Sequence, residues 1–265
     1  MKYQIGLDIG ASKILGIVWD GQKIIKSIKI KTPKNKKELL ASLFKLTSML
    51  FKTNSQENIF SIGIAVAGVL DKNGKILISP NLKFLNNLNL KDLISKKFKR
   101  PTKIINDARA FLLYELKLGM ASQYKNIVAL TIGSGIGGGF SIKNKLVDGC
   151  HNSAGEVGHM IIQGIGNQRS KIKNLSLENL ASVKNLRVGY TQMGQYLGIG
   201  LANLVNILDP EIIVIGGGLA SVDHKILIPA KRVMKKLILS PQAKQIPIII
   251  EKNFETANAI GATLI

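Results

Sequence analysis

The sequence is poor in cysteine, in aromatic residues and in long apolar runs. Its single cysteine, Cys150, excludes an internal disulfide and a cysteine-based metal cluster. Aromatic residues make up 5% of the chain, and no apolar run reaches the ~20 residues that a membrane-spanning helix needs. The amino terminus alternates like a strand, whereas a signal peptide carries a continuous apolar block. We therefore expect a soluble, cytoplasmic protein without a membrane partner.

Acidic residues are also scarce. Asp and Glu number 16 against 37 Lys and Arg, which leaves a formal net charge of +21. Such an excess is typical of nucleic-acid binders. The basic residues are scattered, however, and no helix-turn-helix, zinc-finger spacing or aromatic RNA-binding strand accompanies them. We expect a solvated basic surface that favours anionic substrates, with no specific nucleic acid as partner.

What the chain does contain is enough apolar material for a core. Apolar residues make up 46% of 265 residues, which suits one large domain or two small ones. Strand-like and helix-like segments alternate, and this pattern predicts an α/β fold. Three strands are expected between residues 3 and 30, helices at about 36–51, 92–98 and 108–118, and further strands at 59–68 and 102–106.

A glycine-rich stretch, TIGSGIGGGF at Thr131–Phe140, has the spacing G-x-G-x-x-G at Gly133, Gly135 and Gly138. A dinucleotide site needs a helix that begins inside this motif, and a P-loop needs a following GK[ST]. Neither follows here, because the chain continues with apolar and polar alternation. The motif is therefore expected at a strand-to-strand turn whose N–H groups can face an anion. A plain hairpin turn explains the same glycines.

The glycine stretch is also half of a faint internal repeat. Leu7–Gly16 and Leu130–Gly139 share Leu, Ile and Gly at matched places, but the first has Asp8 where the second has Thr131. Two such strand-turn-strand units offer backbone donors to a polyphosphate. A carboxylate in one of them suits Mg²⁺, which prefers oxygen ligands.

Six motifs together resemble the ROK family of bacterial sugar kinases and sugar-responsive repressors. In chain order they are D-I-G-A-S-K at 8–13, N-D-A-R-A at 106–110, the glycine turn at 133–139, A-G-E-V-G-H at 154–159, L-E-N-L-A-S at 177–182 and V-I-G-G-G-L at 214–219. The resemblance implies an actin-like or hexokinase-like (ribonuclease H-like) α/β fold, with ATP and a hexose bound in a central cleft between two domains. It implies a small domain at 1–105 with a returning helix at 255–265, a larger domain at 106–254, and a homodimer.

By the same resemblance, Asp107 is the catalytic base. A sugar hydroxyl is a poor nucleophile, and a carboxylate within reach can take its proton as the γ-phosphoryl group transfers in line. A helix N-cap is the alternative for Asp107, although both roles can coexist. For His159, one of the implied sugar ligands, a purely structural role is the alternative. These ligands are Asn106, Asp107, Glu156, His159 and Glu178, with Gly68 and Asn81 at the rim.

On the nucleotide side, the resemblance implies that Asp8 holds Mg²⁺ directly or through water. Residues of two turns meet the terminal phosphates of ATP, and a third turn at 216–218 lies beside the adenosine. For the third turn, an ordinary β-α connection is the alternative. The implied ATP-binding residues are Gly10, Ala11, Ser12, Lys13, Gly133, Ser134, Gly135, Gly217 and Gly218.

The chain departs from the family pattern in three ways. Ala11 stands where a second Gly is usual, and Ser12 and Ser134 replace Thr, which keeps the hydroxyls. Arg109 replaces a common Asn. The cysteine-rich zinc segment that follows the histidine is here QGIGNQRSKIKNLS, so we expect no zinc. Arg169 or Lys171 can supply positive charge there instead, unless both are simply solvated loop cations.

The leading hypothesis is an ATP-dependent hexose kinase acting on the 6-hydroxyl of glucose. Kinases for mannose, fructose and N-acetylmannosamine share these motifs, and related enzymes without zinc use polyphosphate. A family repressor is expected to carry a DNA-binding domain before the first strand, which here begins at residue 2. A catalytically silent sugar-sensing protein is the other alternative, and it has no need of both Asp8 and Asp107.

Overall fold

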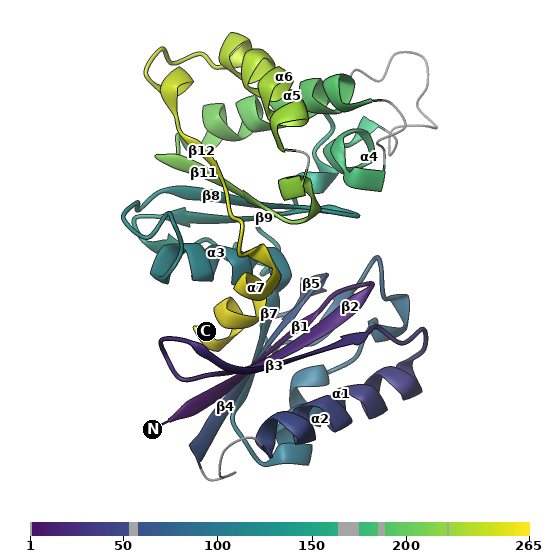
Figure 1. The fold of residues 1–265 in the computed structure, drawn as a ribbon. Helices are drawn as coiled ribbons and strands as arrows, with labels where there is room; N and C mark the ends of the chain where they lie inside the picture. Colours follow the sequence, from purple (N-terminus) through teal and green to yellow (C-terminus); the bar gives the residue numbers. More distant parts are fainter. Residues whose placement is uncertain (1, 53–57, 164–174, 185–188, 222) are drawn as a thin grey trace. The chain divides into compact units, whose positions relative to one another are not determined.

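A computed structural model describes residues 2–52, 58–163, 175–184, 189–221 and 223–265 (Figure 1). The chain divides into two compact units and passes from one to the other after residues 114, 147, 153 and 255. Compactness does not by itself define a domain, so the domain boundaries expected from the sequence stay a prediction. The first unit comprises Met1–Tyr114, Asp148–Ser153 and Thr256–Ile265, and the second comprises Glu115–Val147 and Ala154–Glu255.

A five-stranded mixed sheet in the order β3-β2-β1-β4-β7 forms the centre of the first unit. The first three strands form an antiparallel meander, while β4 and β7 run parallel to β1. A separate antiparallel pair, β5 and β6, follows β4. The bounds are β1 Tyr3–Ile9, β2 Lys13–Trp19, β3 Ile24–Lys31, β4 Ile59–Val66, β5 Val69–Leu70, β6 Ile76–Ile78 and β7 Thr102–Asn106.

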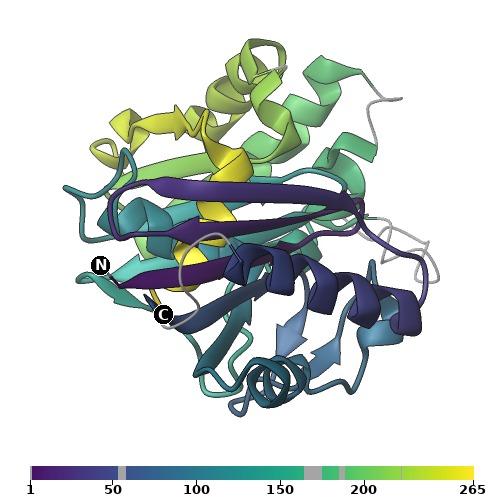
Figure 2. The ribbon, with the colours of Figure 1, turned by 60° about the horizontal axis from the view of Figure 1, so that its bottom comes forward.

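Helices cover both faces of this sheet. On one face, α1 (Lys36–Phe51) and α2 (Leu90–Phe98) bury apolar side chains against Ile5, Leu7 and Ile9 of β1 (Figures 1 and 2). On the other face, α7 (Phe254–Thr263) packs through Ala259 and Ile260 against β2. Because side chains alternate along a strand, the apolar residues of β1 face α1, and Asp8 between them lies on the opposite face, with α7.

The second unit repeats this topology with the order β10-β9-β8-β11-β12. Here too the first three strands are antiparallel, and β11 and β12 run parallel to β8. The two halves of the faint repeat fall on matching hairpins, β1–β2 and β8–β9. The bounds are β8 Ile127–Ile132, β9 Ile136–Ile142, β10 Lys145–Leu146, β11 Ile212–Gly216 and β12 Ile248–Ile250.

One face of the second sheet is covered by α5 (Tyr190–Leu208) and α6 (Asp223–Leu237), with α4 (Leu177–Ala181) beside them (Figure 1). Their buried side chains join those of β8, β9 and β11 in a single apolar core. None of the described helices is both long and apolar enough to cross a membrane.

The local expectations from the sequence are largely confirmed. Helix α1 has the expected bounds, and the glycine stretch lies between two strands with no helix inside it. The first strand after α1 ends at Val66, two residues earlier than expected. After β11 the chain forms a short 3-10 turn, η6 (Gly218–Ser221), before the next helix begins at Asp223.

Two buried glutamates meet in the second unit, near two of the points where the chain passes between units. Glu115 lies on α3 (Asp107–Lys117), and Glu251 directly follows β12; their exposed fractions are 0% and 2%. Burial, reinforced by the charge of Glu251, raises the pKa of Glu115 to about 8, although backbone N–H groups of Ala121 and Met120 oppose the shift. The Glu115 carboxyl therefore keeps its proton to a higher pH than a free carboxyl group does.

This raised pKa predicts how stability depends on pH. Between about 4.5 and about 8 the folded protein binds more protons than the unfolded chain, so the free energy of unfolding falls as the pH rises through that window. Glu115→Gln keeps a hydrogen-bonding amide and removes the titration. We expect it to raise the free energy of unfolding at pH 8 by ~1 kcal/mol or more, with no gain at pH 5, in urea titrations at both pH values.

Glu211→Gln is the matched control. Its exposed carboxylate accepts hydrogen bonds from the backbone N–H groups of Lys125 and Asn126 at 2.8 and 2.7 Å, and these lower the pKa of Glu211. This variant should lose stability at pH 8 or leave it unchanged. An equal gain for Glu115→Gln at both pH values would contradict the raised pKa of Glu115.

Candidate active site

The hairpin turn between β1 and β2 carries the first group of expected nucleotide ligands. The N–H of Gly10 donates to the carbonyl of Lys13 at 3.0 Å, which closes the turn. Thr32 at the end of β3 secures it, because its N–H donates to the Ser12 carbonyl at 3.1 Å and its hydroxyl donates to the Gly10 carbonyl at 2.7 Å. The turn is therefore held from behind, while the side chains of Ala11, Ser12 and Lys13 remain exposed.

Asp8, two residues before this turn, has a strongly perturbed carboxyl group. Burial first, and the neighbouring charge of Asp107 second, raise the pKa of Asp8 to about 7. A hydrogen bond from Asn258 on α7 and the charge of Lys13 oppose the shift. The structure thus brings Asp8 and Asp107, which lie far apart in the sequence, into one electrostatic site inside the first unit.

Asp107 is the first residue of α3, at the end of β7. The helix cap is supplied by its neighbour: Asn106 Oδ1 accepts the N–H groups of Ala108 at 2.9 Å and of Arg109 at 3.2 Å. Asp107 Oδ1 accepts the Ala108 N–H as well, at 2.9 Å. The main N-cap of α3 is therefore Asn106, not Asp107 as the alternative interpretation had it. The helix does not need Asp107 as its cap.

The two expected rim residues are placed differently. Asn106 Nδ2 donates to the carbonyl of Gly68 at 3.1 Å, so Gly68 lies beside the β7–α3 junction. Asn81 is exposed after β6, and no contact seen among the described residues joins it to Asn106. Its loop is nevertheless tied to this region, because the Ser79 hydroxyl donates to the carbonyl of Ala67 at 2.8 Å.

In the second unit, Glu178 on α4 supports the glycine turn between β8 and β9. Its Oε2 accepts the N–H of Ile136 at 2.8 Å. Gly135 approaches this carboxylate so closely that a Cβ there would collide with it. The N–H of Val183, just after α4, donates to the carbonyl of Gly133 at 2.9 Å. Glu178, an expected sugar ligand, is thus in direct contact with the expected phosphate-binding turn at 133–135.

Glu156 and His159 lie on the short η3 segment (Val157–His159) and the residue before it. His159 Nε2 is 4.0 Å from Glu156 Oε2, and both side chains are exposed, by 67% and 42%. Partial burial raises the pKa of Glu156; the charge of His159 opposes the shift and that of Glu178 adds to it. Solvent moderates these effects at such exposure. The second unit therefore gathers these three expected sugar ligands.

The third turn, after β11, lies against the glycine turn. Gly217 has a φ of +97°, and a Cβ there would meet the backbone of Ile132 at the end of β8. Only glycine combines that dihedral with such close approach. Gly218 faces Gly133 across the same junction. The expected adenosine-side and phosphate-side turns of the second unit are thus neighbours.

Two expected residues cannot be placed, and several contributors were not expected. Arg169 and Lys171 lie in 164–174, outside the described residues. Sequence reasoning missed Asn258, Asp148 and Asn152. For Asn258 a signal existed, a polar residue inside the apolar run of α7, whereas Asp148 and Asn152 carry no recognisable motif.

Comparison with known protein families decides which family this fold and these turns represent. The model of the ROK family matches residues 4–192 and 169–265, which together cover nearly the whole chain. The chain belongs to the ROK family. Members of this family act as sugar kinases and as regulators, and relatives of both kinds are similar to this chain.

Three ROK proteins illustrate the likeness. A putative xylose repressor from Caldicellulosiruptor sp. strain Rt8B.4 is 28% identical over 97% of this chain and 76% of its own length. A glucokinase from Streptomyces coelicolor is 24% identical over 99% of this chain and 96% of its own. The crystal structure of a ROK family glucokinase from Streptomyces griseus, in complex with glucose and AMPPNP, superposes with a TM-score of 0.85 at 22% identity, over 98% and 97% of the two chains. The expected actin-like or hexokinase-like fold is therefore confirmed.

Proposed function

We propose that this ROK protein is an ATP-dependent kinase that phosphorylates a hexose hydroxyl, with the 6-hydroxyl of glucose as the first acceptor to test. The observation that carries the proposal is the electrostatic pairing of Asp8 and Asp107. Keeping two carboxylates together costs free energy, and sugar recognition alone does not require it. A kinase uses both, one beside the metal-bound phosphates and one at the acceptor hydroxyl.

The residues around Asp8 fit a magnesium ion that arrives with its nucleotide. Mg²⁺ takes one or two protein carboxylates and completes its shell with phosphates and water. Among the described residues no group of three or more acidic, His or Cys side chains forms a metal cage, which suits this partial binding mode. Asp8 would hold the ion directly or through water, and its charge repulsion with Asp107 would be relieved. When bound, Mg²⁺ neutralises charge on the transferring phosphoryl group.

The other groups divide the work of binding. Asp107 takes the proton of the acceptor hydroxyl at its carboxylate, while the sugar ligands hold the remaining hydroxyls in place. The two glycine-containing turns, at 10–13 and 133–135, offer backbone N–H groups to the phosphates. The sugar ligands of this proposal are Asn106, Glu156, His159 and Glu178.

The similarity to xylose repressors favours a second candidate, a sugar-responsive regulator that binds its sugar without phosphorylating it. A kinase for another hexose and the use of polyphosphate as donor are further alternatives. Zinc-independent activity, a homodimer and the lack of a specific nucleic-acid partner are parts of the proposal that have still to be measured.

A combined binding and turnover experiment separates these candidates. We expect saturating glucose with MgATP, at ~100 times Kd, to stabilise the fold by ~2.7 kcal/mol, a rise in Tm of roughly 5–10 °C. ADP should form with one sugar of a panel that includes glucose, mannose, fructose, N-acetylmannosamine and xylose. A rise in Tm without ADP formation indicates the regulator. If no sugar of the panel produces either a rise in Tm or ADP, the proposal is contradicted. Duplex DNA at ~150 mM salt should bind only weakly.

A further inference from the structure

Arg109 is the most completely buried cation among the described residues of the first unit. It lies on α3 two positions after Asp107, and its side chain is 6% exposed. Its guanidinium forms an ion pair with Asp148 and donates from Nη1 to Asn152 Oδ1 at 2.7 Å. Nε has no hydrogen-bond partner within the described part of the chain. Burial lowers the pKa of Arg109, but an arginine stays charged.

The partners of Arg109 lie on a segment that leads into the sugar ligands. Asp148–Ser153 is the only piece of chain between β10 and η3 that the first unit contains, and residues 147 and 154 on either side belong to the second. Glu156 follows shortly after the end of this segment. Arg109 therefore connects the helix that begins with Asp107 to the segment that precedes Glu156.

Asn152 extends this connection to a third element. Its Nδ2 donates to the carbonyls of Leu70 at 3.1 Å and of Asp71 at 3.2 Å, at the end of β5. The same stretch of chain begins at Gly68, which accepts a hydrogen bond from Asn106. The contacts thus form a closed ring that leaves α3 at Arg109 and returns to Asn106, the last residue of β7 and the cap of α3.

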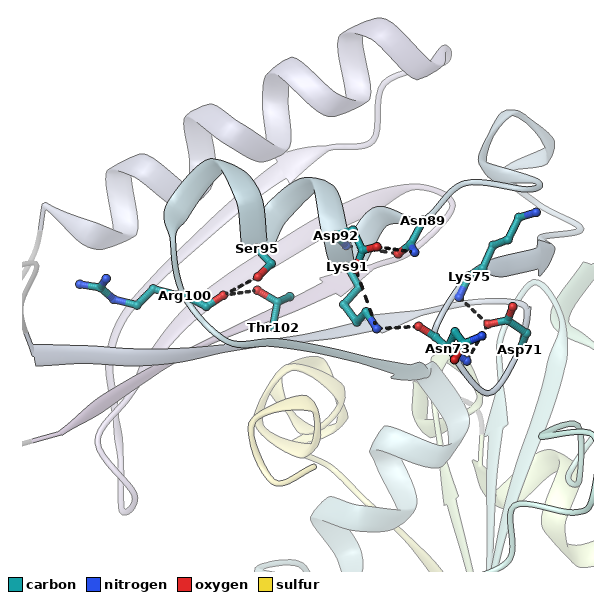
Figure 3. Close-up of polar contacts among 9 residues, drawn as sticks. All are labelled: Asp71, Asn73, Lys75, Asn89, Lys91, Asp92, Ser95, Arg100 and Thr102. Atoms are coloured by element: carbon teal, nitrogen blue, oxygen red, sulfur yellow. Dashed lines mark hydrogen bonds and ion pairs between the residues drawn. The ribbon is translucent and has the colours of Figure 1, made fainter.

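The far side of the ring is rigidly built (Figure 3). Asp71 Oδ1 accepts the N–H groups of Asn73 at 2.9 Å and Lys75 at 2.8 Å, which closes a tight turn. Lys91 on α2 donates to the carbonyl of Asn73 at 2.6 Å. The Asp71 turn is therefore held from α2, and Asn152 bonds to a fixed point.

We propose that Arg109 is a positioning residue that, through Asp148 and Asn152, holds both Asp107 and the approach to Glu156 in their working geometry. The proposal rests on the kinase function proposed above. The Asp148 side chain is 56% exposed, so solvent screens its ion pair with the buried Arg109, and the pair contributes little net stability. Its role here is to fix positions, because one planar guanidinium contacts the Asp148 carboxylate and the Asn152 amide at the same time. A displacement of ~1 Å in a reacting group can cost ~10²-fold in rate.

The test compares five variants in steady-state kinetics and thermal unfolding. Arg109→Met should lower kcat by ~10-fold or more and raise the sugar KM, with the KM for MgATP within about two-fold and Tm within a few degrees of the parent. Arg109→Lys should recover part of kcat, since lysine keeps the charge but offers one contact point. Asn152→Gly removes the amide bridge without strain, because Asn152 already has a φ of +58°.

Arg100→Met is the control. Arg100 also donates to a backbone carbonyl, that of Ile59 at 2.6 Å, but it lies at the far end of α2 from the Asp71 turn (Figure 3). It should leave kcat and both KM values unchanged. In the double variant, Arg109→Met with Asn152→Gly, the losses should not add, because both break the same ring.

The outcomes are distinguishable. A parent chain that phosphorylates a sugar, together with an Arg109→Met variant whose kcat and sugar KM are unchanged, overturns the role of Arg109 alone. A variant that only lowers Tm also overturns that role, since this is what a merely structural residue would do. A parent chain inert toward every sugar overturns the proposed function and this role together.

Discussion

We expect Asp107→Asn to lower kcat for sugar phosphorylation by ~10²-fold or more, while the sugar Kd changes only a few-fold. The amide cannot take the proton of the acceptor hydroxyl, but it has the same shape and can still accept a hydrogen bond. The helix should not suffer, because Asn106 supplies the cap of α3 and stays in place. Kinetics and calorimetric sugar titration on one preparation, together with Tm, give the measurement.

Asp92→Asn is a matched control for this variant. Asp92 also lies in the first turn of a helix, α2, and is exposed there beside Asn89 and Lys91. It should retain full activity. Turnover of Asp107→Asn within a few-fold of the parent would remove Asp107 from the mechanism, even if the protein proves to be a kinase.

Local patterns along the chain predicted several of the elements that carry the site, although not η3 and α4. Alternation after the glycine motif predicted the β8–β9 hairpin, because strand and helix periods differ within a few residues. The internal repeat predicted that β1–β2 and β8–β9 are matching strand-turn-strand units. The position of Asp107 at the start of a helix was also predicted, although the cap itself fell to Asn106, a distinction that depends on the backbone angles of one residue.

Long-range polar partners could not be predicted in this way. Arg109 and Asn152 are 43 positions apart, and their meeting depends on the return of a short segment to the first unit. The coupling of Asp8 to Asn258 likewise requires α7 to pack on the sheet. Apolar periodicity specifies which face of an element is buried, but it does not specify which polar side chains meet there.

The second large effect is expected for Asp8→Asn, which should abolish most activity and yet stabilise the ligand-free protein. Because folding raises the pKa of Asp8 from 3.8 to about 7, the folded state binds more protons than the unfolded one across that window. The free energy of unfolding therefore falls as the pH rises from about 3.8 to about 7. At pH 8 we expect Asp8→Asn to raise Tm by about 2–6 °C, a gain of ~1–2 kcal/mol after allowing for the partial exposure of the side chain.

The same substitution should lower kcat/KM for MgATP by ~10²-fold or more, because a neutral amide is a poor ligand for the ion. A binding readout accompanies the kinetics: MgATP should raise the Tm of the parent far more than that of the variant. Asp20→Asn, in the exposed turn after β2, is the control and should gain no stability at pH 8, since backbone N–H groups of Lys23 and Gln22 lower the pKa of Asp20.

The pH dependence makes this prediction specific to the Asp8–Asp107 pair. In the parent, kcat/KM for MgATP should rise with pH through about 7 as Asp8 ionises, because only the carboxylate holds the ion. Asp107→Asn removes the neighbouring charge, so the residual activity of that variant should rise at a lower pH than in the parent. If the rise of kcat/KM with pH occurs at the same pH in Asp107→Asn as in the parent, the two carboxylates act independently. If that rise is still present in Asp8→Asn, the titration belongs to another group.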